Sequence, residues 1–263
     1  MRIVTWNLNG IRAAIRKGLD DFISEIDADI WMFQEVRALP EQLPKTWNPP
    51  KGMELLWHPA EKKGYSGVST WSRVGIQEES RGIEASNDPK DLEGRFLLSR
   101  HGDLLLGNTY LPSGSAKEER QIWKEQWMED YLNFTEKFAN SETPVILAGD
   151  LNICHTEDDI WNPKGNKNNS GFLPQERQWF TQLLESGWHD LFREYSGQRK
   201  GPYSWWSNRG NARADDKGWR IDYLLGNAAA AKLVSHVEIL REGGLVVSDH
   251  APVILDLNFS CSE

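Results

Sequence analysis

Polar side chains able to bind metal recur in this sequence at the ends of short apolar segments that are typical of buried strands. These side chains are Asn7, Glu35, Asp150, Asn152, Asp249 and His250. Strand ends are where α/β folds build their sites. Carboxylate and amide oxygens with a single imidazole and no cysteine suit Mg²⁺ or Mn²⁺ better than zinc. Because Mg²⁺ commonly joins one or two carboxylates to phosphate oxygens, the set favours phosphoryl chemistry.

Each of these residues also has an ordinary structural explanation when it is taken alone. Asn7 could close a turn, Glu35 could cap a helix, and Asp249 could accept hydrogen bonds from backbone N–H groups. The chemical interpretation therefore depends on considering these residues together and on the strands and helices that position them.

Alternating strand and helix patterns predict the elements that carry these residues. Apolar or alternating runs predict strands over residues 3–6, 30–33, 55–57, 67–71, 96–98, 104–106, 145–148, 221–225 and 253–257. Helical patterns cover residues 11–26, 117–138 and 174–184. No linker, charge block or low-complexity segment separates them, so we expect one α/β domain over residues 1–258 and a short tail over 259–263.

The charge balance is acidic overall and basic in one segment. The 263 residues hold 30 Lys and Arg against 39 Asp and Glu, a net charge of −9, and this average argues against a nucleic-acid-binding protein. Residues 161–220 hold 10 basic and 6 acidic side chains, so this segment is +4 and the remainder is −13. Long polar loops are predicted there over 161–171 and 207–218, and such loops are usually functional. The excess predicts either a face that attracts phosphate or an ordinary cluster of solvated charges.

Signals for the cell compartment are few. The opening residues MRIVTWNLNG lack the regions of a signal peptide, and no run approaches the roughly 20 apolar residues of a membrane span. Cys154 and Cys261 are too few for a disulfide framework or a cysteine-based zinc site, so we expect reduced thiols. A cytoplasmic location without membrane contact is expected, with nucleoid association if the source is bacterial.

Nine segments of the chain are long or unusual enough to be compared with known families. They are TWNLNGIRA (5–13), QEVRA (34–38), KGYSGV (63–68), EGRF (93–96), TYLPSG (109–114), AGDLNICH (148–155), NPKGNKNNSGFLPQER (162–177), YSWWSNRGNARADDKGWRIDY (203–223) and SDHAPV (248–253). In this order, from residue 2 to about 257, the sequence resembles the exonuclease III type of AP endonuclease. The resemblance implies the DNase I-like fold of the endonuclease/exonuclease/phosphatase superfamily, an α/β four-layer sandwich of two packed mixed β-sheets flanked by helices.

The resemblance also implies chemical roles for the matching residues. The metal ligands would be Asn7, Glu35 and Asp249, holding Mg²⁺, for which Mn²⁺ could substitute. Asp150 would orient and deprotonate the attacking water, Asn152 would bond the phosphate, and His250, paired with Asp222, would donate to a phosphate oxygen. A Tyr110 phenolate is the alternative nucleophile. We favour water on Asp150, because ionising a tyrosine at neutral pH costs ~4 kcal/mol.

Substrate contacts are implied in the same way. Trp205, Trp219 and Ile221 match positions that line the family's pocket for an extruded deoxyribose. Most of the 13 tryptophans must nevertheless be core, and we expect this of Trp6, Trp31, Trp57, Trp71, Trp123 and Trp127. Backbone phosphates would be contacted by Tyr65, Lys164, Asn166, Asn169, Arg209 and Lys217.

Three positions depart from patterns found in the family. Asn9 stands where some members carry Asp, and Ser115 stands where some relatives carry Arg or Gln. Arg209-Gly210 replaces bulkier residues with which others probe the duplex. The small pair Ser170-Gly171 should leave the pocket lip open to an internal abasic site.

The resemblance therefore implies a monomeric, Mg²⁺-dependent nuclease of base excision repair. Its substrate would be double-stranded DNA with abasic sites or blocked 3′ ends, cut 5′ to the abasic site, with 3′-phosphodiesterase and 3′→5′ exonuclease activity. One alternative is a phosphatase or phosphodiesterase of the same fold acting on inositol phosphates or lipids, and another is a non-catalytic DNA-binding relative. The segments KGNKNNSGFLPQER (164–177) and GWRIDY (218–223) argue against the first alternative, and the intact catalytic set argues against the second.

Overall fold

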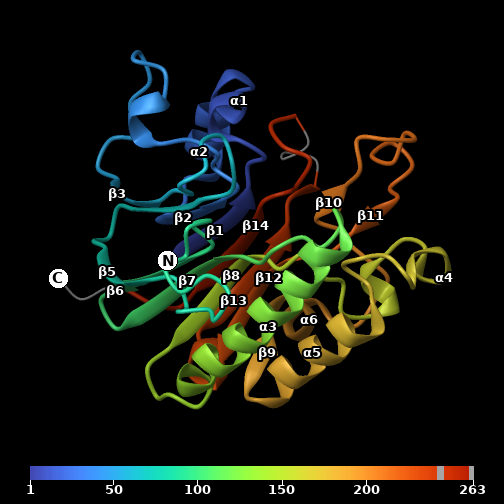
Figure 1. Cartoon of the computed structure of the whole chain (residues 1–263). Helices are drawn as coiled ribbons and strands as arrows, with labels where there is room; N and C mark the ends of the chain where they lie inside the picture. Colours follow the sequence, from blue (N-terminus) through green and yellow to red (C-terminus); the bar gives the residue numbers. More distant parts are fainter. Residues whose placement is uncertain (242–245, 261–263) are drawn as a thin grey trace.

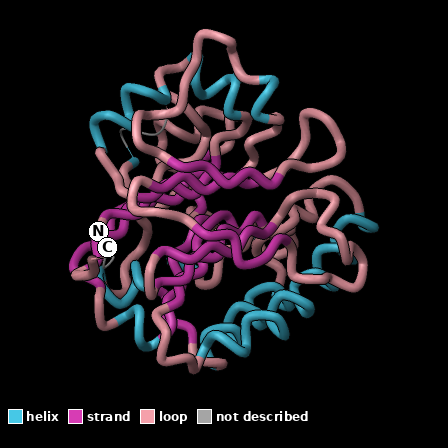
Figure 2. The backbone as a smooth tube through the Cα atoms, turned by 90° about the vertical axis from the view of Figure 1, so that its left-hand side faces the viewer, coloured by secondary structure: helices cyan, strands magenta, loops and turns pink. Residues whose placement is uncertain are grey.

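Two six-stranded sheets lie one above the other at the centre of the computed structural model, which describes residues 1–241 and 246–260 (Figures 1 and 2). The first sheet has the order β13-β14-β1-β2-β4-β3, with β1 Arg2–Asn7, β2 Ile30–Gln34, β3 Glu54–His58, β4 Val68–Ser72, β13 Val234–Ile239 and β14 Val253–Leu257. The second has the order β5-β6-β7-β8-β12-β9, with β5 Gln77–Arg81, β6 Phe96–His101, β7 Leu104–Tyr110, β8 Val145–Asp150, β9 Trp188–Asp190 and β12 Asp222–Asn227. Both sheets are mixed, because β1 runs parallel to β2 and β7 parallel to β8, whereas the other pairs are antiparallel.

Helices cover the outer faces of both sheets (Figure 2). The first sheet is covered by α1 Ile11–Arg16 and α2 Leu19–Ile26, and the second mainly by α3 Glu118–Ala139 and α5 Pro174–Glu185. Shorter helical segments are η1 Pro40–Gln42, η2 Glu157–Asp159, α4 Pro163–Asn166, α6 Leu191–Ser196 and α7 Ala228–Ala231. A separate ribbon pairs β10 Trp205–Trp206 with β11 Gly218–Trp219.

Three apolar clusters hold these four layers together. One lies between the sheets and includes Ile3 and Met32 of the first sheet and Leu106 and Ile146 of the second. The others lie between each sheet and its helices. Each sheet therefore buries both faces, as the predicted four-layer sandwich requires, and that prediction is confirmed.

A polar network joins the two sheets within this apolar interior. Asn108 of β7 donates from Nδ2 to the carbonyl oxygens of Phe33 and Ser69, at 3.2 and 3.0 Å. Its Oδ1 accepts from Gln34 Nε2 at 2.8 Å, and Gln34 Nε2 also donates to Thr5 Oγ1 at 2.9 Å. Asn108 and Gln34 are fully buried, so the bonds fix how the sheets sit on each other.

Most predicted elements are present, and the differences have local causes. The single helix predicted over residues 11–26 is wrong. The structure has the two helices α1 and α2 there, because Gly18 between them has a φ of 94°, which interrupts the helix. The strand β5 was missed because its residues QEESR are polar and mostly exposed at the sheet edge. The loop predicted over 161–171 contains the single turn α4. Cys154 is a buried free thiol, whereas Cys261 lies outside the described residues.

Two further expectations concern the chain as a whole. Within residues 1–241 and 246–260, no helix is long and apolar enough to cross a membrane. The single domain predicted over 1–258 stays a prediction.

Replacing Asn108 with alanine should lower the free energy of unfolding by about 2–3 kcal/mol, because buried partners on β2 and β4 of the first sheet lose their hydrogen bonds. Urea unfolding followed by tryptophan fluorescence measures this. The control is Asn133→Ala on the exposed face of α3, which should change the free energy by less than about 0.5 kcal/mol. Equal effects of the two substitutions would contradict the assigned role of the network.

Candidate active site

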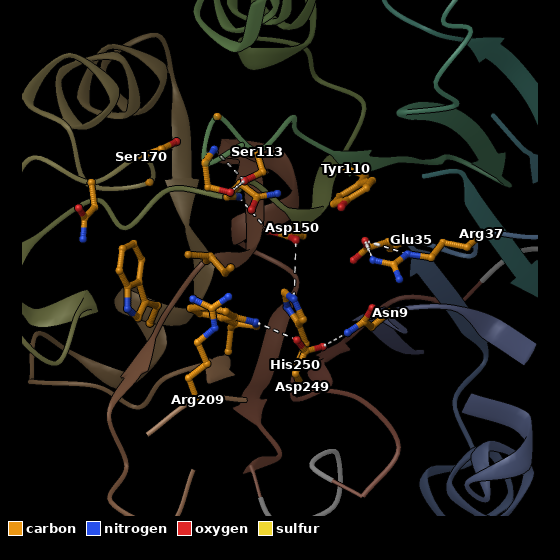
Figure 3. A pocket seen from close by; sticks show the side chains of 18 of the residues that line it. Asn9, Glu35, Arg37, Tyr110, Ser113, Asp150, Ser170, Arg209, Asp249 and His250 are labelled. Atoms are coloured by element: carbon orange, nitrogen blue, oxygen red, sulfur yellow. Dashed lines mark hydrogen bonds and ion pairs between the residues drawn. The ribbon is translucent and has the colours of Figure 1, made fainter. Parts of the chain in front are cut away.

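Strand ends from both sheets meet at one edge of the sandwich around a cavity of about 740 Å³. Asn7 ends β1, Tyr110 ends β7, Asp150 ends β8 and Asp222 begins β12, while Glu35 follows β2 directly. In Figure 3, Glu35 and Arg37 lie on one side of Asp150 and His250, whereas Ser170 and Arg209 lie on the other. The cavity is therefore built from residues that are far apart in sequence.

Asp150 is almost fully buried and held by amide groups. Its Oδ2 accepts from Asn7 Nδ2 at 2.9 Å, and its Oδ1 accepts from the backbone N–H of Asn152 at 2.8 Å. Burial is the main cause that raises the pKa of Asp150 to about 7, and the nearby Asp222 carboxylate adds to it. A carboxylate with this pKa can accept a proton from a bound water near neutral pH.

His250 lies between two aspartates. Its Nδ1 is 2.9 and 3.1 Å from the two carboxylate oxygens of Asp222, and its Nε2 is 3.9 Å from Asp150 Oδ2. Burial by itself lowers the pKa of His250, but the charge and hydrogen bond of Asp222 outweigh it and raise the pKa to about 10. His250 is therefore an imidazolium that donates from Nδ1 to Asp222 and presents Nε2–H to the cavity.

Ser204 fixes Asp222 in turn. Its hydroxyl donates to Asp222 Oδ2 at 2.6 Å and accepts from the backbone N–H groups of Ile221 and Asp222, each at 3.1 Å. One ligand atom from each of Asp150, Asp222 and His250 lies within 4.8 Å of the other two, so this trio could hold a metal ion.

Two further carboxylates face the same cavity. Asp249 accepts from Asn9 Nδ2 at 2.8 Å and from Trp205 Nε1 at 3.2 Å. Burial raises the pKa of Asp249, but the His250 charge and these bonds outweigh it and lower the pKa below its ordinary value. Glu35 accepts from Arg37 Nε at 3.0 Å and from a second N–H of the same guanidinium.

Tyr110 is held as a phenol. Burial, with the Glu35 charge as the second cause, raises the pKa of Tyr110 well above its ordinary value. The guanidinium of Arg95 lies 4.8 Å from the ring centroid and donates to the Tyr110 carbonyl oxygen at 3.0 Å. These contacts orient the ring without ionising it.

Trp205, Trp219 and Ile221 form an apolar part of the wall of the same cavity, which we call the slot. Trp205 and Trp219 meet edge to face with ring centroids 6.0 Å apart, and both pack against the buried cluster that contains Ile221 and Phe172. The backbone pairing of β10 with β11 places them opposite each other. Both rings remain partly exposed, as expected of pocket walls rather than core.

Most predicted site residues meet at this cavity. The cavity is lined by Glu35, Tyr110, Asp150, Asn152, Asn169, Trp205, Arg209, Trp219, Ile221, Asp249 and His250. Asn7 and Asp222 are buried beside it, in contact with Asp150 and His250. Tyr65 lines the neighbouring cavity with Arg95, and the cavity lining does not include Lys164, Asn166 or Lys217.

Two findings were not foreseen from the sequence. Arg37 and Ser204 contact the site directly, and their only signal was their place inside the segments QEVRA and YSWW. The basic excess of residues 161–220 is also partly internal. Arg193 and Arg220 are buried in ion pairs with Asp159, and Arg220 also pairs with Asp190.

A two-sheet sandwich with a histidine–aspartate pair, a buried aspartate and separate carboxylates at its strand ends is suited to phosphodiester hydrolysis. Residues 4–250 match the endonuclease/exonuclease/phosphatase family, and the chain belongs to that family.

Comparisons with individual proteins support this family assignment. The chain is 37% identical to an exodeoxyribonuclease of Bacillus subtilis over 98% of its own length and 100% of that protein. It is 34% identical to the DNA repair nuclease APEX1 of Danio rerio, covering 98% and 82% of the two chains. A solved structure of the 3′ phosphatase NExo from Neisseria, bound to a product DNA hairpin, matches with a TM-score of 0.88, 25% identity, and 98% and 100% coverage. The predicted enzyme class is confirmed: the chain is a nuclease related to DNA repair enzymes.

Ser204→Ala should lower kcat about tenfold, because Asp222 loses a charge-assisted hydrogen bond that orients His250. Single-turnover nuclease assays measure this rate. Ser235→Ala, at an exposed position of the edge strand β13, is the control and should keep the wild-type rate. An unchanged rate in a folded Ser204 variant would rule out this orienting role.

Proposed function

We propose that this protein hydrolyses the phosphodiester bond 5′ to an abasic site in double-stranded DNA, with 3′-phosphodiesterase and 3′→5′ exonuclease activity at blocked or free 3′ ends. The main support is that the apolar slot of Trp205, Trp219 and Ile221 opens on the same cavity as Asp150 and His250. A sugar without its base fits such a slot, and a lesion costs less free energy to extrude than a paired nucleotide.

The chain's own residues supply the proton transfers and the positioning. Asp150 orients a water and accepts its proton as the oxygen attacks phosphorus in line with the leaving 3′ oxygen. His250 donates from Nε2 to a non-bridging phosphate oxygen, and Asn152 bonds the same group from its side chain. Tyr110 approaches the phosphate as a neutral phenol, because its raised pKa disfavours the alternative phenolate nucleophile.

The donors around the cavity fit a hard divalent cation. They are carboxylate and amide oxygens, which Mg²⁺ prefers and Mn²⁺ also accepts. We assign the ligands to Glu35 and Asp249, with Asn7 beside them. Bound there, the ion would neutralise phosphate charge and stabilise the leaving oxygen. We prefer this set to the trio of Asp150, Asp222 and His250, because a protonated imidazole does not ligate a metal.

Contacts to the DNA backbone lie outside the reacting groups. We assign them to Tyr65, Lys164, Asn166, Asn169, Arg209 and Lys217, which would give salt-sensitive affinity without sequence preference. We further propose that the protein acts as a monomer, in the cytoplasm and without membrane contact.

The inositol phosphatase alternative is less well supported by the cavity. Among the described lining residues the cations are Arg37, Arg209 and His250, and the first two lie on opposite sides of Asp150 and His250. Arg37 is already paired with Glu35. A pocket for several phosphate groups would need more unpaired cations close together.

A duplex with one tetrahydrofuran abasic analogue tests the function directly. With Mg²⁺ the protein should cut the strand once, 5′ to the analogue, and excess EDTA should abolish the cut. Gel analysis of an end-labelled strand gives both results, and inositol phosphates serve as the control substrate. Cleavage that persists in EDTA, or phosphate release from inositol phosphates alone, would overturn the proposal.

Asp150→Asn should lower kcat by at least about a thousandfold while the fold is kept, because the amide cannot accept the water proton. Circular dichroism checks the fold, and single-turnover incision measures the rate. Asp103→Asn, in the exposed β6–β7 turn, is the matched control and should cut like the wild type. A near wild-type rate for the Asp150 variant would refute its role as the base.

A further inference from the structure

A buried ion pair lies behind the cavity wall and takes no part in the chemistry described above. Lys124 of α3 and Glu176 in the first turn of α5 are both fully buried, with Nζ 2.6 Å from Oε1. The two helices lie side by side over the second sheet (Figure 1). Burying two charges costs desolvation free energy, so such a pair is weak evidence for stability alone.

Lys124 contacts the catalytic strand end through the backbone. Its Nζ donates to the carbonyl oxygen of Asn152 at 3.0 Å. Asn152 has a φ of 50°, a left-handed conformation that is uncommon for non-glycine residues and that asparagine adopts more readily than most. Its N–H is bound by Asp150 and its side chain donates to the Leu111 carbonyl at 2.8 Å, so Lys124 supplies the third restraint.

Glu176 holds the opposite lip of the cavity. Its Oε2 accepts from the backbone N–H groups of Gly171 and Leu173, at 2.6 and 3.0 Å. Its Oε1 accepts from Gln121 Nε2 at 3.2 Å and from Ser170 Oγ at 3.4 Å, beside Lys124. One carboxylate thus fixes the lip Ser170-Gly171.

The two restrained segments meet at Gly171. A Cβ on this residue would lie 3.0 Å from the Asn152 carbonyl oxygen and 3.1 Å from the ring of Trp219. Gly171 also accepts a hydrogen bond from the Cys154 N–H at 2.7 Å. If the lip shifted, Gly171 would therefore press against both the ring of Trp219 and the backbone of Asn152.

We propose that Lys124 and Glu176 are a positioning pair that sets the preference for an abasic sugar over an intact nucleotide. Glu176 keeps the lip and the Trp219 wall at the width of a bare sugar, and Lys124 keeps Asn152 aligned on the phosphate. This inference rests on the proposed function, because it names what makes the same site selective.

The test compares Lys124→Met, Glu176→Gln and the double variant with the wild type. Leu183→Ala is the matched control, because Leu183 is buried in the same helix α5 and is not among the residues that line the cavity. Thermal unfolding shows which variants are folded. The double variant removes both charges together, so it can fold even if a single variant with one unpaired charge does not.

Two substrates are used with Mg²⁺, a tetrahydrofuran duplex and an undamaged duplex with a recessed 3′ end. Anisotropy in EDTA also compares binding of the abasic and intact duplexes. Glu176→Gln should raise KM for the abasic duplex about tenfold and reduce the binding preference by a similar factor. Lys124→Met should mainly lower kcat, about tenfold on both substrates, and the double variant should show both effects. Leu183→Ala should lower Tm but keep both constants.

A purely structural pair would behave differently. Folded variants that keep the wild-type KM, kcat and binding preference within twofold would overturn the inference, as would parallel losses in Leu183→Ala. Failure of the proposed function would be recognised separately, because the wild-type protein itself would then not cut at the abasic analogue. In that case the lower exonuclease kcat of Lys124→Met still supports the positioning role of Lys124, and an unchanged kcat overturns it.

Discussion

The site depends on a hydrogen bond that crosses from one sheet to the other. Asn7 ends a strand of the first sheet and donates to Asp150, which ends a strand of the second. A carboxylate buried as deeply as that of Asp150 must be hydrogen-bonded. Because Asn7 belongs to the other sheet, a rearrangement within the sheet of Asp150 could not replace this bond. The Gln34–Asn108 bonds lie behind it and hold the sheets in the same relative position. The distance between Asn7 and Asp150 at the cavity is thus fixed by the packing of two sheets rather than by any one loop.

The second constraint is the repulsion between neighbouring carboxylates, which a cation within the site offsets. Asp150, Asp222 and Asp249 could not stay close together if all were ionised without a cation. The imidazolium of His250 lies between Asp150 and Asp222, and its charge helps to lower the pKa of Asp249, whereas burial and the Asp222 charge raise the pKa of Asp150. The net charge of −9 was therefore a poor guide to partners, because it averages over such groups. The basic segment 161–220 misled in the opposite direction, since Arg193 and Arg220 are buried in ion pairs with aspartates instead of adding to an exposed basic face.

Sequence patterns predicted the central strands and candidate residues at their ends because both depend on short-range signals, whereas the four-layer arrangement and the roles of the residues were implied by the family resemblance. Apolar runs marked the central strands, and the polar residues at their ends proved to be neighbours across the cavity. The patterns missed what depends on contacts between distant segments. The polar edge strand β5 carries no apolar alternation, and the break at Gly18 is a backbone conformation that helical periodicity does not report. Ser204 and Arg37 are ordinary residue types whose roles exist only once Asp222 and Glu35 are in place.

The loops around the slot illustrate why charged residues are buried in a nuclease of this shape. The segments 152–161, 169–173 and 199–204 have little regular structure, so many of their backbone groups lack partners in a helix or sheet. Side chains satisfy them instead. Glu176 binds two N–H groups of one segment, Lys124 a carbonyl of another, and Arg193 the carbonyls of Arg199 and Gly201 in the third. Long charged side chains reach such groups from neighbouring helices, and their desolvation is offset by pairing with each other. These bonds keep the walls of the cavity in one arrangement, and a nuclease depends on such positioning because a misplacement of about 1 Å can lower the rate about a hundredfold.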